Sequence, residues 1–327
     1  MRILAPFSMG KTLVEHVLRG PLDVTSGDKV YQFPTVSWIE NVSVRSNGHL
    51  LLSMLTAPEL RGINPIDPKP KISLIYQFPN ATSVLGSAEV KPDIFAVVTA
   101  NVSLTGGTVP GSYAIWEVDL KRRTTRARKA VNVPANWTLN GLARLSKDYF
   151  LGSDSGAGAV YRFNLKTGAS KVVIQDATMK GSKDLPFGVN GIRVYDSYLY
   201  YDNTGKGLFC RIPINPYTGI ARGPANVLAD GLQGLDDFAI GTETGTTYLA
   251  NFVQNSVLSV DDNGEVKTVA SKLGGKVFYG PTSVRFGRTR LDRNIAYAVT
   301  SGASWNSSDG SFTPIEGGKV IAIKVCD

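Results

Sequence analysis

The sequence predicts an all-β fold, a six-bladed β-propeller, from three observations. A short inner-strand pattern occurs six times, two further sets of apolar runs follow it in order, and a strand motif at 30–34 is repeated at 75–79. Repeats of about 45 to 50 residues with four strands each are typical of propeller blades. The composition agrees, because 34 glycines and 17 prolines among 327 residues suit many short strands joined by tight turns.

The inner-strand pattern is an apolar residue, a position for a side chain that faces the centre, one further residue and an apolar run. The six stretches are 39–42, 85–88, 139–142, 189–192, 235–238 and 281–284. Their central positions are Glu40, Gly86, Asn140, Asn190, Asp236 and Thr282. If the stretches are equivalent strands around one axis, these side chains meet at its centre.

A second strand is expected after each inner strand, where turn residues precede an apolar run. These runs are 49–53, 94–98, 149–152, 198–201, 248–251 and 295–299. Third strands are expected at 114–119, 160–164, 208–212, 256–260 and 320–324, with 59–66 taking this place in the first unit. Each unit therefore has at least three strands that can pair in a meander.

The repeated motif supplies the fourth, outer strand and closes the ring. Val-Tyr-Gln-Phe-Pro at 30–34 matches Ile-Tyr-Gln-Phe-Pro at 75–79, which is the expected outer strand of the first unit. The first copy precedes every inner strand, so we expect it to complete the last blade and remove an open sheet edge. A two-domain sandwich and a β-helix are the alternatives, and neither explains the isolated first copy. We expect one propeller domain over 29–327 and an N-terminal extension over 1–28, in which 11–19 suits a short helix.

Charge and targeting signals constrain the partners only weakly. The net charge is +8, and its densest run, at 121–129, is interpreted as a solvated hairpin because no nucleic-acid motif accompanies it. We expect no nucleic-acid partner, no membrane span, and a monomer or weak homodimer. No apolar segment typical of a signal peptide opens the chain, yet Asn-X-Ser/Thr sequons slightly exceed chance, so both the secretory pathway and the cytoplasm stay open. The sequons are at Asn41, Asn80, Asn101, Asn136 and Asn306.

Four of the six central positions carry oxygen donors suited to a hard cation. Ca²⁺ takes about six to eight oxygens from carboxylates, amide carbonyls and water. The sequence therefore predicts a Ca²⁺ or Mg²⁺ site formed by Glu40, Asn140, Asn190 and Asp236, and no organic cofactor. The absence of His and Cys at these positions argues against zinc and copper. The alternative is structural, because Asn-Gly and Asp-Asp pairs also mark turns. Asp237 is expected to point away from the centre, since side chains alternate along a strand.

These residues resemble the SMP-30/gluconolactonase/luciferin-regenerating-enzyme-like superfamily of six-bladed propellers, over 30–325. The resemblance implies one divalent ion on the axis, held by Glu40 in Trp-Ile-Glu-Asn, Asn140 in Leu-Asn-Gly, Asn190 in Val-Asn-Gly and Asp236 in Leu-Asp-Asp. Asp236, Asn140 and Asn190 are the expected catalytic residues, with Asp236 as the general base of the lactonases. Thr138 stands where sugar-lactone members tend to carry an arginine, and Leu-Asp-Asp replaces Pro-Asp-Gly. These departures put a sugar-lactone substrate in doubt.

Side chains that precede the inner strands, or follow the second strands, are expected to surround one end of the axis. Several aromatic rings around few polar groups are typical of a site for a flat, partly apolar molecule, although each ring taken alone is more often part of a core. The Gly- and Thr-rich segment 100–112 suits a lid. The predicted substrate-binding residues are Trp38, Asn101, Trp137, Thr138, Asp154, Phe187, Asn203, Phe252, Tyr279, Thr282 and Trp305.

The stretch Trp-Ile-Glu-Asn-Val-Ser-Val-Arg at 38–45, with Asn-Gly-His-Leu-Leu after it, resembles the fungal, secondary-metabolism branch of this superfamily. That resemblance implies a hetero-Diels–Alderase, which joins a tropolone or phenol quinone methide to a humulene-type sesquiterpene. Two alternatives stay open. One is a Ca²⁺-dependent lactonase or esterase of the gluconolactonase type, in which Asp236 activates water. The other is a non-enzymatic ligand-binding propeller.

Overall fold

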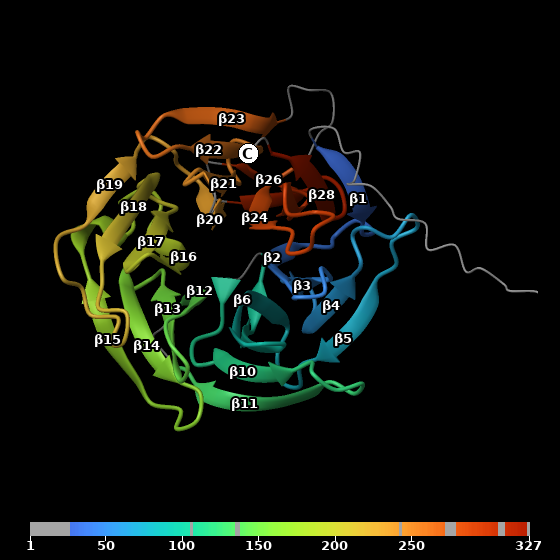
Figure 1. Cartoon of the computed structure of the whole chain (residues 1–327), viewed down its shortest axis with the longest axis horizontal. Coiled ribbons are helices and arrows are strands. Elements are labelled where there is room, and N and C mark those ends of the chain that lie inside the picture. The colour runs from blue at the N-terminus through green and yellow to red at the C-terminus, as the bar shows by residue number, and fades with distance from the viewer. Residues whose placement is uncertain are drawn as a thin grey trace, which may run out of the picture.

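Six four-stranded antiparallel sheets surround one axis (Figure 1), which confirms the propeller predicted from the sequence. The computed structural model describes residues 27–104, 107–134, 138–241, 244–271, 279–306 and 311–325. The expected helix at 11–19 lies outside the described residues, as does the expected extension up to position 26. The inner strands are β2 (Ile39–Val44), β6 (Ser83–Lys91), β12 (Leu139–Arg144), β16 (Val189–Tyr195), β20 (Leu235–Ile240) and β24 (Pro281–Phe286).

The remaining strands follow in the predicted order from the axis outwards. The second strands are β3 (Leu50–Met54), β7 (Ile94–Ala100), β13 (Tyr149–Asp154), β17 (Tyr198–Asn203), β21 (Thr247–Asn251) and β25 (Ile295–Thr300). The third strands are β4 (Glu59–Ile63), β10 (Ala114–Asp119), β14 (Ala159–Asn164), β18 (Leu208–Pro213), β22 (Ser256–Val260) and β28 (Lys319–Lys324). The outer strands are β5 (Ser73–Gln77), β11 (Arg126–Asn132), β15 (Ser170–Gln175), β19 (Asn226–Ala229), β23 (Val266–Ser271) and β1 (Asp28–Gln32).

Two small hairpins extend the loops between second and third strands. The first joins β8 (Val102–Ser103) to β9 (Gly107–Thr108), and the second joins β26 (Ala303–Asn306) to β27 (Ser311–Pro314). Because second strands end where inner strands begin, both hairpins lie at that end of the axis, which we call the mouth. A 3-10 turn, η1 (Ala177–Met179), follows β15. The β8–β9 hairpin falls within the predicted lid segment, and its role as a lid stays a prediction.

The ring closes as predicted, because the first strand of the chain completes the last blade. β1 pairs antiparallel with β28, and Asp28 lies opposite Ala322. The junction is tight: a Cβ added at Gly317 would collide with the carbonyl oxygen of Phe33, so the closure requires glycine there. The last blade thereby has the same four strands, in the same order from the axis outwards, as the other five blades.

The apolar core lies between neighbouring sheets. All six residues of β2 are buried, and its apolar side chains pack with those of the last blade, such as Tyr297 and Val320, in one cluster. Each blade therefore buries its faces against two others, and the ring forms a continuous wall around the axis. The basic run at 121–129 connects β10 to β11 and is mostly exposed, as the hairpin interpretation predicted. Among the described residues, no helix has the length and apolar character that crossing a membrane requires.

Candidate functional site

Each inner strand carries an irregularity at the central position of the predicted pattern. In all six blades the register against the second strand shifts at that point. In the first blade the pairing passes from Ile39 directly to Asn41, so Glu40 has no partner in β3. A β-bulge leaves the extra residue out of the ladder and redirects its side chain. The bulges explain how side chains of separate sheets come to face one axis.

The axis is too crowded for six side chains at this level. A Cβ added at Gly86, the central residue of the second blade, would collide with the carbonyl oxygen of Asn140 on the neighbouring inner strand. Thr282, the central residue of the last blade, is fully buried and donates a hydrogen bond to the carbonyl oxygen of Ile39 at 2.6 Å. These two positions hold adjacent blades together, and the four oxygen-bearing residues are left to face the axis.

Glu40 and Asp236 place two carboxyl groups within electrostatic range of each other. Burial raises the pKa of Glu40 to about 7; a hydrogen bond from Trp38 opposes this rise, and the charge of Asp237 adds to it. Burial also raises the pKa of Asp236 well above its ordinary value, and the charge of Glu40 is the next cause. Two carboxylates that repel each other in a low-dielectric site retain protons at neutral pH or attract a cation. The pair therefore provides either hydrogen-bond donors or metal ligands.

Hydrogen bonds fix the orientation of this pair. The indole Nε1 of Trp38 donates to Glu40 Oε2 at 2.9 Å. The amide Nδ2 of Asn190 donates to Asp236 Oδ1 at 2.9 Å and to Thr204 Oγ1 at 3.1 Å. Asn140 is buried on β12, between the strands that carry Gly86 and Asn190. The structure thus brings Glu40, Asn190 and Asp236 near one another, and the four-residue metal site that includes Asn140 stays a prediction.

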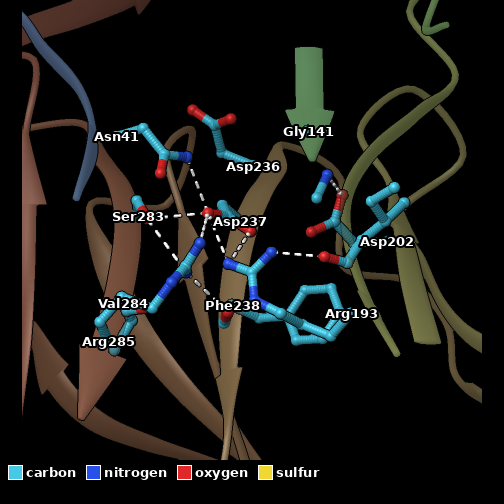
Figure 2. A network of polar contacts seen from close by, with 12 residues as sticks. Asn41, Gly141, Arg193, Asp202, Asp236, Asp237, Phe238, Ser283, Val284 and Arg285 are labelled. Atoms are coloured by element: carbon cyan, nitrogen blue, oxygen red, sulfur yellow. Dashed lines mark hydrogen bonds and ion pairs between the residues drawn. The ribbon is translucent and has the colours of Figure 1, made fainter. Parts of the chain in front are cut away.

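Asp237 anchors a separate polar network below this level, as Figure 2 shows. The carboxylates of Asp236 and Asp237 point in different directions, as the alternation along a strand predicts. Asp237 is 3% exposed, and its partners come from three other inner strands. The partners are Arg193 at 2.7 Å, Arg285 at 3.0 Å, Asn41 at 2.8 Å and Ser283 at 2.8 Å. The network ties four blades together and supports the carboxyl pair above it.

Aromatic rings gather at the mouth beside Glu40. The rings of Trp38 and Phe252 are stacked with centroids 5.8 Å apart, and Phe312 of β27 meets both, at 5.2 and 5.5 Å. Tyr113 belongs to the same packed cluster. Burial raises the pKa of its hydroxyl to about 12, and the charges of Glu40 and Asp154 contribute to the rise. We call Trp38, Tyr113, Phe252 and Phe312 the mouth aromatic cluster. Its tyrosine stays protonated at neutral pH.

Sequence analysis predicted only two members of this cluster. Tyr113 directly precedes a third strand, as Trp38 precedes an inner strand, and that parallel was the available signal. Phe312 follows a Ser-, Asp- and Gly-rich stretch with no strand pattern, so its position depends on the path of the β26–β27 hairpin. Among the predicted aromatic residues, Phe187 and Tyr279 are half-buried in loops at the mouth, and Trp305 is half-buried on β26, opposite Phe312. Trp137 lies outside the described residues.

The polar residues predicted at the ends of second strands have roles within the loops. Asp154 Oδ1 accepts hydrogen bonds from the backbone N–H groups of Thr138, Gly156 and Ala157, at 3.0 to 3.1 Å. Asn203 Nδ2 donates to two backbone carbonyl oxygens, and its Oδ1 accepts from Lys206 N. Both side chains are fully buried. Their role in substrate binding, like that of the half-buried Thr138, stays a prediction.

Asn101 and Asp154 each keep one buried side-chain oxygen, Oδ1 and Oδ2 respectively, without a hydrogen-bond partner among the described residues. Asn101 follows β7 at the start of the β8–β9 hairpin, and its side chain is half-buried. A ligand could satisfy such an amide oxygen at the mouth, and the role of Asn101 in substrate binding stays a prediction.

Comparison with known proteins assigns the chain to a family. No family model matches it. Among curated proteins, “Putative hetero-Diels-Alderase asR5” of Sarocladium schorii is 30% identical over 310 residues, which cover 83% of this chain and 77% of that protein. A “Putative hetero-Diels-Alderase” of a Phoma species is 24% identical over 301 residues, covering 83% and 85%. The chain belongs to this hetero-Diels–Alderase family.

Solved structures confirm the six-bladed propeller fold that the sequence of this hetero-Diels–Alderase family member predicts. A luciferin-regenerating enzyme matches with a TM-score of 0.66 at 15% identity, covering 94% of this chain and 98% of the other. Regucalcin of Agrobacterium tumefaciens, described as a calcium-binding protein, matches with a TM-score of 0.60 at 14% identity, covering 92% and 96%. At these identities the likeness concerns the fold alone.

In this hetero-Diels–Alderase family member, the side-chain oxygens near the axis are of the kind that binds a hard cation. No group of three or more His, Cys, Asp or Glu side chains that could hold a metal occurs in the part of the chain that the structure describes, so a metal here would also need the amide oxygens of Asn140 and Asn190. Two carboxyl groups and two amides are ligands that Ca²⁺ and Mg²⁺ accept, with water completing the shell. The raised pKa values of Glu40 and Asp236 show that ionising these buried groups is unfavourable, and a bound cation would offset that cost.

Proposed function

We propose that this protein is a hetero-Diels–Alderase that joins a tropolone or phenol quinone methide to the alkene of a humulene-type sesquiterpene at the mouth. The family supports the reaction class, since the relative that is 30% identical carries that name. One structural observation carries the proposal further. The mouth aromatic cluster adjoins neutral hydrogen-bond donors, because Trp38 both stacks on Phe252 and holds Glu40 by its indole N–H.

The reaction needs positioning more than acid–base chemistry. A quinone methide presents an O=C–C=C unit. Its oxygen forms a bond to one alkene carbon, and its terminal carbon forms a bond to the other. Two σ bonds replace two π bonds, no group leaves, and no proton is transferred. Holding the two reactants in a near-attack geometry removes part of a bimolecular barrier, in favourable cases about 7–11 kcal/mol. A protein with aromatic surfaces and no nucleophile therefore suffices.

The residues of the mouth have distinct roles in this scheme. Phe252 and Phe312, which are half-buried, offer the ring surface on which the flat quinone methide stacks and against which the terpene packs, and the buried Trp38 holds both rings in place. Negative charge develops on the carbonyl oxygen as the bonds form. The hydroxyl of Tyr113, and the carboxyl groups of Glu40 and Asp236 in their protonated forms, donate hydrogen bonds to it; the raised pKa values of all three groups favour these forms.

Adduct formation tests the proposal directly. The purified protein is incubated with a quinone-methide precursor and a humulene alcohol, and the adduct is followed by chromatography and mass spectrometry against the uncatalysed rate. Phe252→Ala should lower kcat/KM by about tenfold or more because it removes ring surface from the site, and Trp38→Ala should do the same because it removes the support of that ring and of Glu40. Tyr217→Ala, whose ring is 76% exposed, is the matched control and should leave the rate unchanged. No acceleration by the wild-type protein would refute the proposal.

A Ca²⁺-dependent lactonase or esterase is the second candidate, and the axial set of two carboxyl groups and two amides favours it. When bound, the ion would polarise an acyl oxygen. Asp236 would then hold the proton of an attacking water, and Asn190 would orient Asp236 through its hydrogen bond. EDTA and Asp236→Asn should each reduce lactone hydrolysis by about 100-fold or more in this case, the scale of a lost general base. If neither adduct nor hydrolysis product forms, the protein is a ligand-binding propeller.

A further inference from the structure

A cavity of about 260 Å³ lies at the opposite end of the axis from the mouth. The parts of five inner strands that are farthest from the mouth line it: those of β2, β6, β12, β16 and β24. We call it the lower axial cavity. Its volume equals that of about eight or nine water molecules in the liquid, so it holds a polyatomic ligand. The Asp237 network separates it from the carboxyl pair above.

The lining of the lower axial cavity has more cations than anions. Four arginines face it: Arg144, Arg193, Arg285 and Arg288. Arg193 and Arg285 share one carboxylate, Asp237, at 2.7 and 3.0 Å. Arg288 pairs with Glu89 at 2.6 Å, and Arg144 forms no ion pair with any described residue. Even if Asp202, which lies within electrostatic range of Arg193, is counted as charged, the arginines outnumber the carboxylates.

The excess charge is partly removed from water. The side chains of Arg193 and Arg285 are only 18% and 16% exposed. Burying a charge without a partner costs several kcal/mol, so a second anion on the open side of these guanidinium groups would stabilise the folded protein. Guanidinium groups bind phosphate oxygens in a bidentate manner, and the hydroxyl groups of Ser43 and Ser87 on the same wall add neutral polar groups.

We propose that the lower axial cavity is an oxyanion site that binds a diphosphate group. Arg193 and Arg285 form its floor, and Arg144 and Arg288 hold the ligand from the rim. The cavity has room for more than a single phosphate, and at least one positive charge stays unmatched. Inorganic diphosphate and the diphosphate of a nucleotide share this chemistry. The site lies apart from the mouth, so it is independent of the reaction proposed above.

Thermal unfolding and calorimetry with inorganic pyrophosphate test this site. The wild-type melting temperature should rise in a saturable way, by about 4 °C at a concentration near 100 times Kd. Inorganic phosphate should bind more weakly, and sodium chloride of equal ionic strength should give no saturable rise. ADP tests the source of the ligand: binding as tight as that of pyrophosphate assigns the site to a nucleotide, and weaker binding assigns it to the free anion.

Variants locate the binding. The double variant Arg144→Gln, Arg288→Gln should lose at least about tenfold in pyrophosphate affinity, since each arginine supplies a charge-assisted contact. If that variant does not fold, Arg144→Gln alone serves, because its side chain is exposed. Arg128→Gln, 51% exposed on an outer strand, is the matched control and should bind as the wild type does. Trp38→Ala should also retain binding, which separates this proposal from the function of the mouth. The proposal is wrong if pyrophosphate and chloride act alike, or if the variants without rim arginines bind unchanged.

Discussion

Replacing Glu40 by glutamine should stabilise the metal-free protein above neutral pH and have little effect near pH 5. Burial raises the pKa of Glu40 from its ordinary value of 4.5 to about 7, so in this range the folded state holds a proton that the unfolded state has lost. Stability therefore falls as the pH rises from about 4.5 to 7, and the full penalty is present above that range. Glutamine keeps the shape of the side chain and an acceptor for Trp38, and it never becomes charged.

The magnitude follows from the two pKa values. At 1.36 kcal/mol per pKa unit, their difference corresponds to about 3 kcal/mol at alkaline pH. Part of this gain comes from Asp236, because removing the charge of Glu40 lowers the pKa of that neighbour. Urea unfolding followed by tryptophan fluorescence, in EDTA at about pH 5 and about pH 8, measures the change in the free energy of unfolding.

A surface variant and added Ca²⁺ test whether the effect comes from the buried charge of Glu40. Glu265→Gln, at an exposed position of the fifth blade, should follow the wild type at both pH values. Saturating Ca²⁺ should reverse the order of the two proteins, because a charged carboxylate binds the ion more strongly than a neutral amide oxygen does. A wild-type stability that does not fall between pH 5 and pH 8, or a Glu40→Gln variant with the same pH dependence, would refute the argument.

Three further predictions concern other parts of the structure. Asp237→Asn should lower the free energy of unfolding by about 3–5 kcal/mol, because two buried arginines lose their shared partner; a loss below about 1 kcal/mol in urea unfolding would contradict this. Gly317→Ala should cost more than about 2 kcal/mol by its collision with Phe33, whereas Gly223→Ala, in an outer loop, should stay within about 1 kcal/mol. Tyr113→Phe should slow adduct formation by about tenfold at unchanged thermal stability, and an unchanged rate would exclude its hydroxyl as a donor.

The ring and its closure could be predicted from the sequence because each depends on local patterns. Strand-forming runs separated by turn residues fix the meander, and the duplicated Tyr-Gln-Phe-Pro motif has one consistent position in the last blade. The axial set Glu40, Asn140, Asn190 and Asp236 followed from the same repeat. What the pattern does not contain is the register shift at each of these positions, because a bulge is a property of a strand pair and not of one strand.

Other parts of the site depend on loop paths and on repeats that the sequence analysis did not use. The mouth aromatic cluster needed the position of Phe312, which a short hairpin determines. Asp154 and Asn203 are each followed four residues later by a glycine with positive φ, so the sequence contained a turn signal that explains their buried, hydrogen-bonded side chains. Arginine near the end of three inner-strand stretches was likewise visible, yet only the structure shows that these side chains face one cavity.

The pairing of β1 with β28 has a consequence for biosynthesis. Blades one to five each come from one continuous segment, so each can form soon after it leaves the ribosome. The sixth has to wait for the final strand, and until then β1 has no neighbour and two blade faces stay uncovered. A nascent chain that stalls before residue 319 therefore exposes apolar surface of the kind that chaperones bind. This surface becomes buried when β1 pairs with β28.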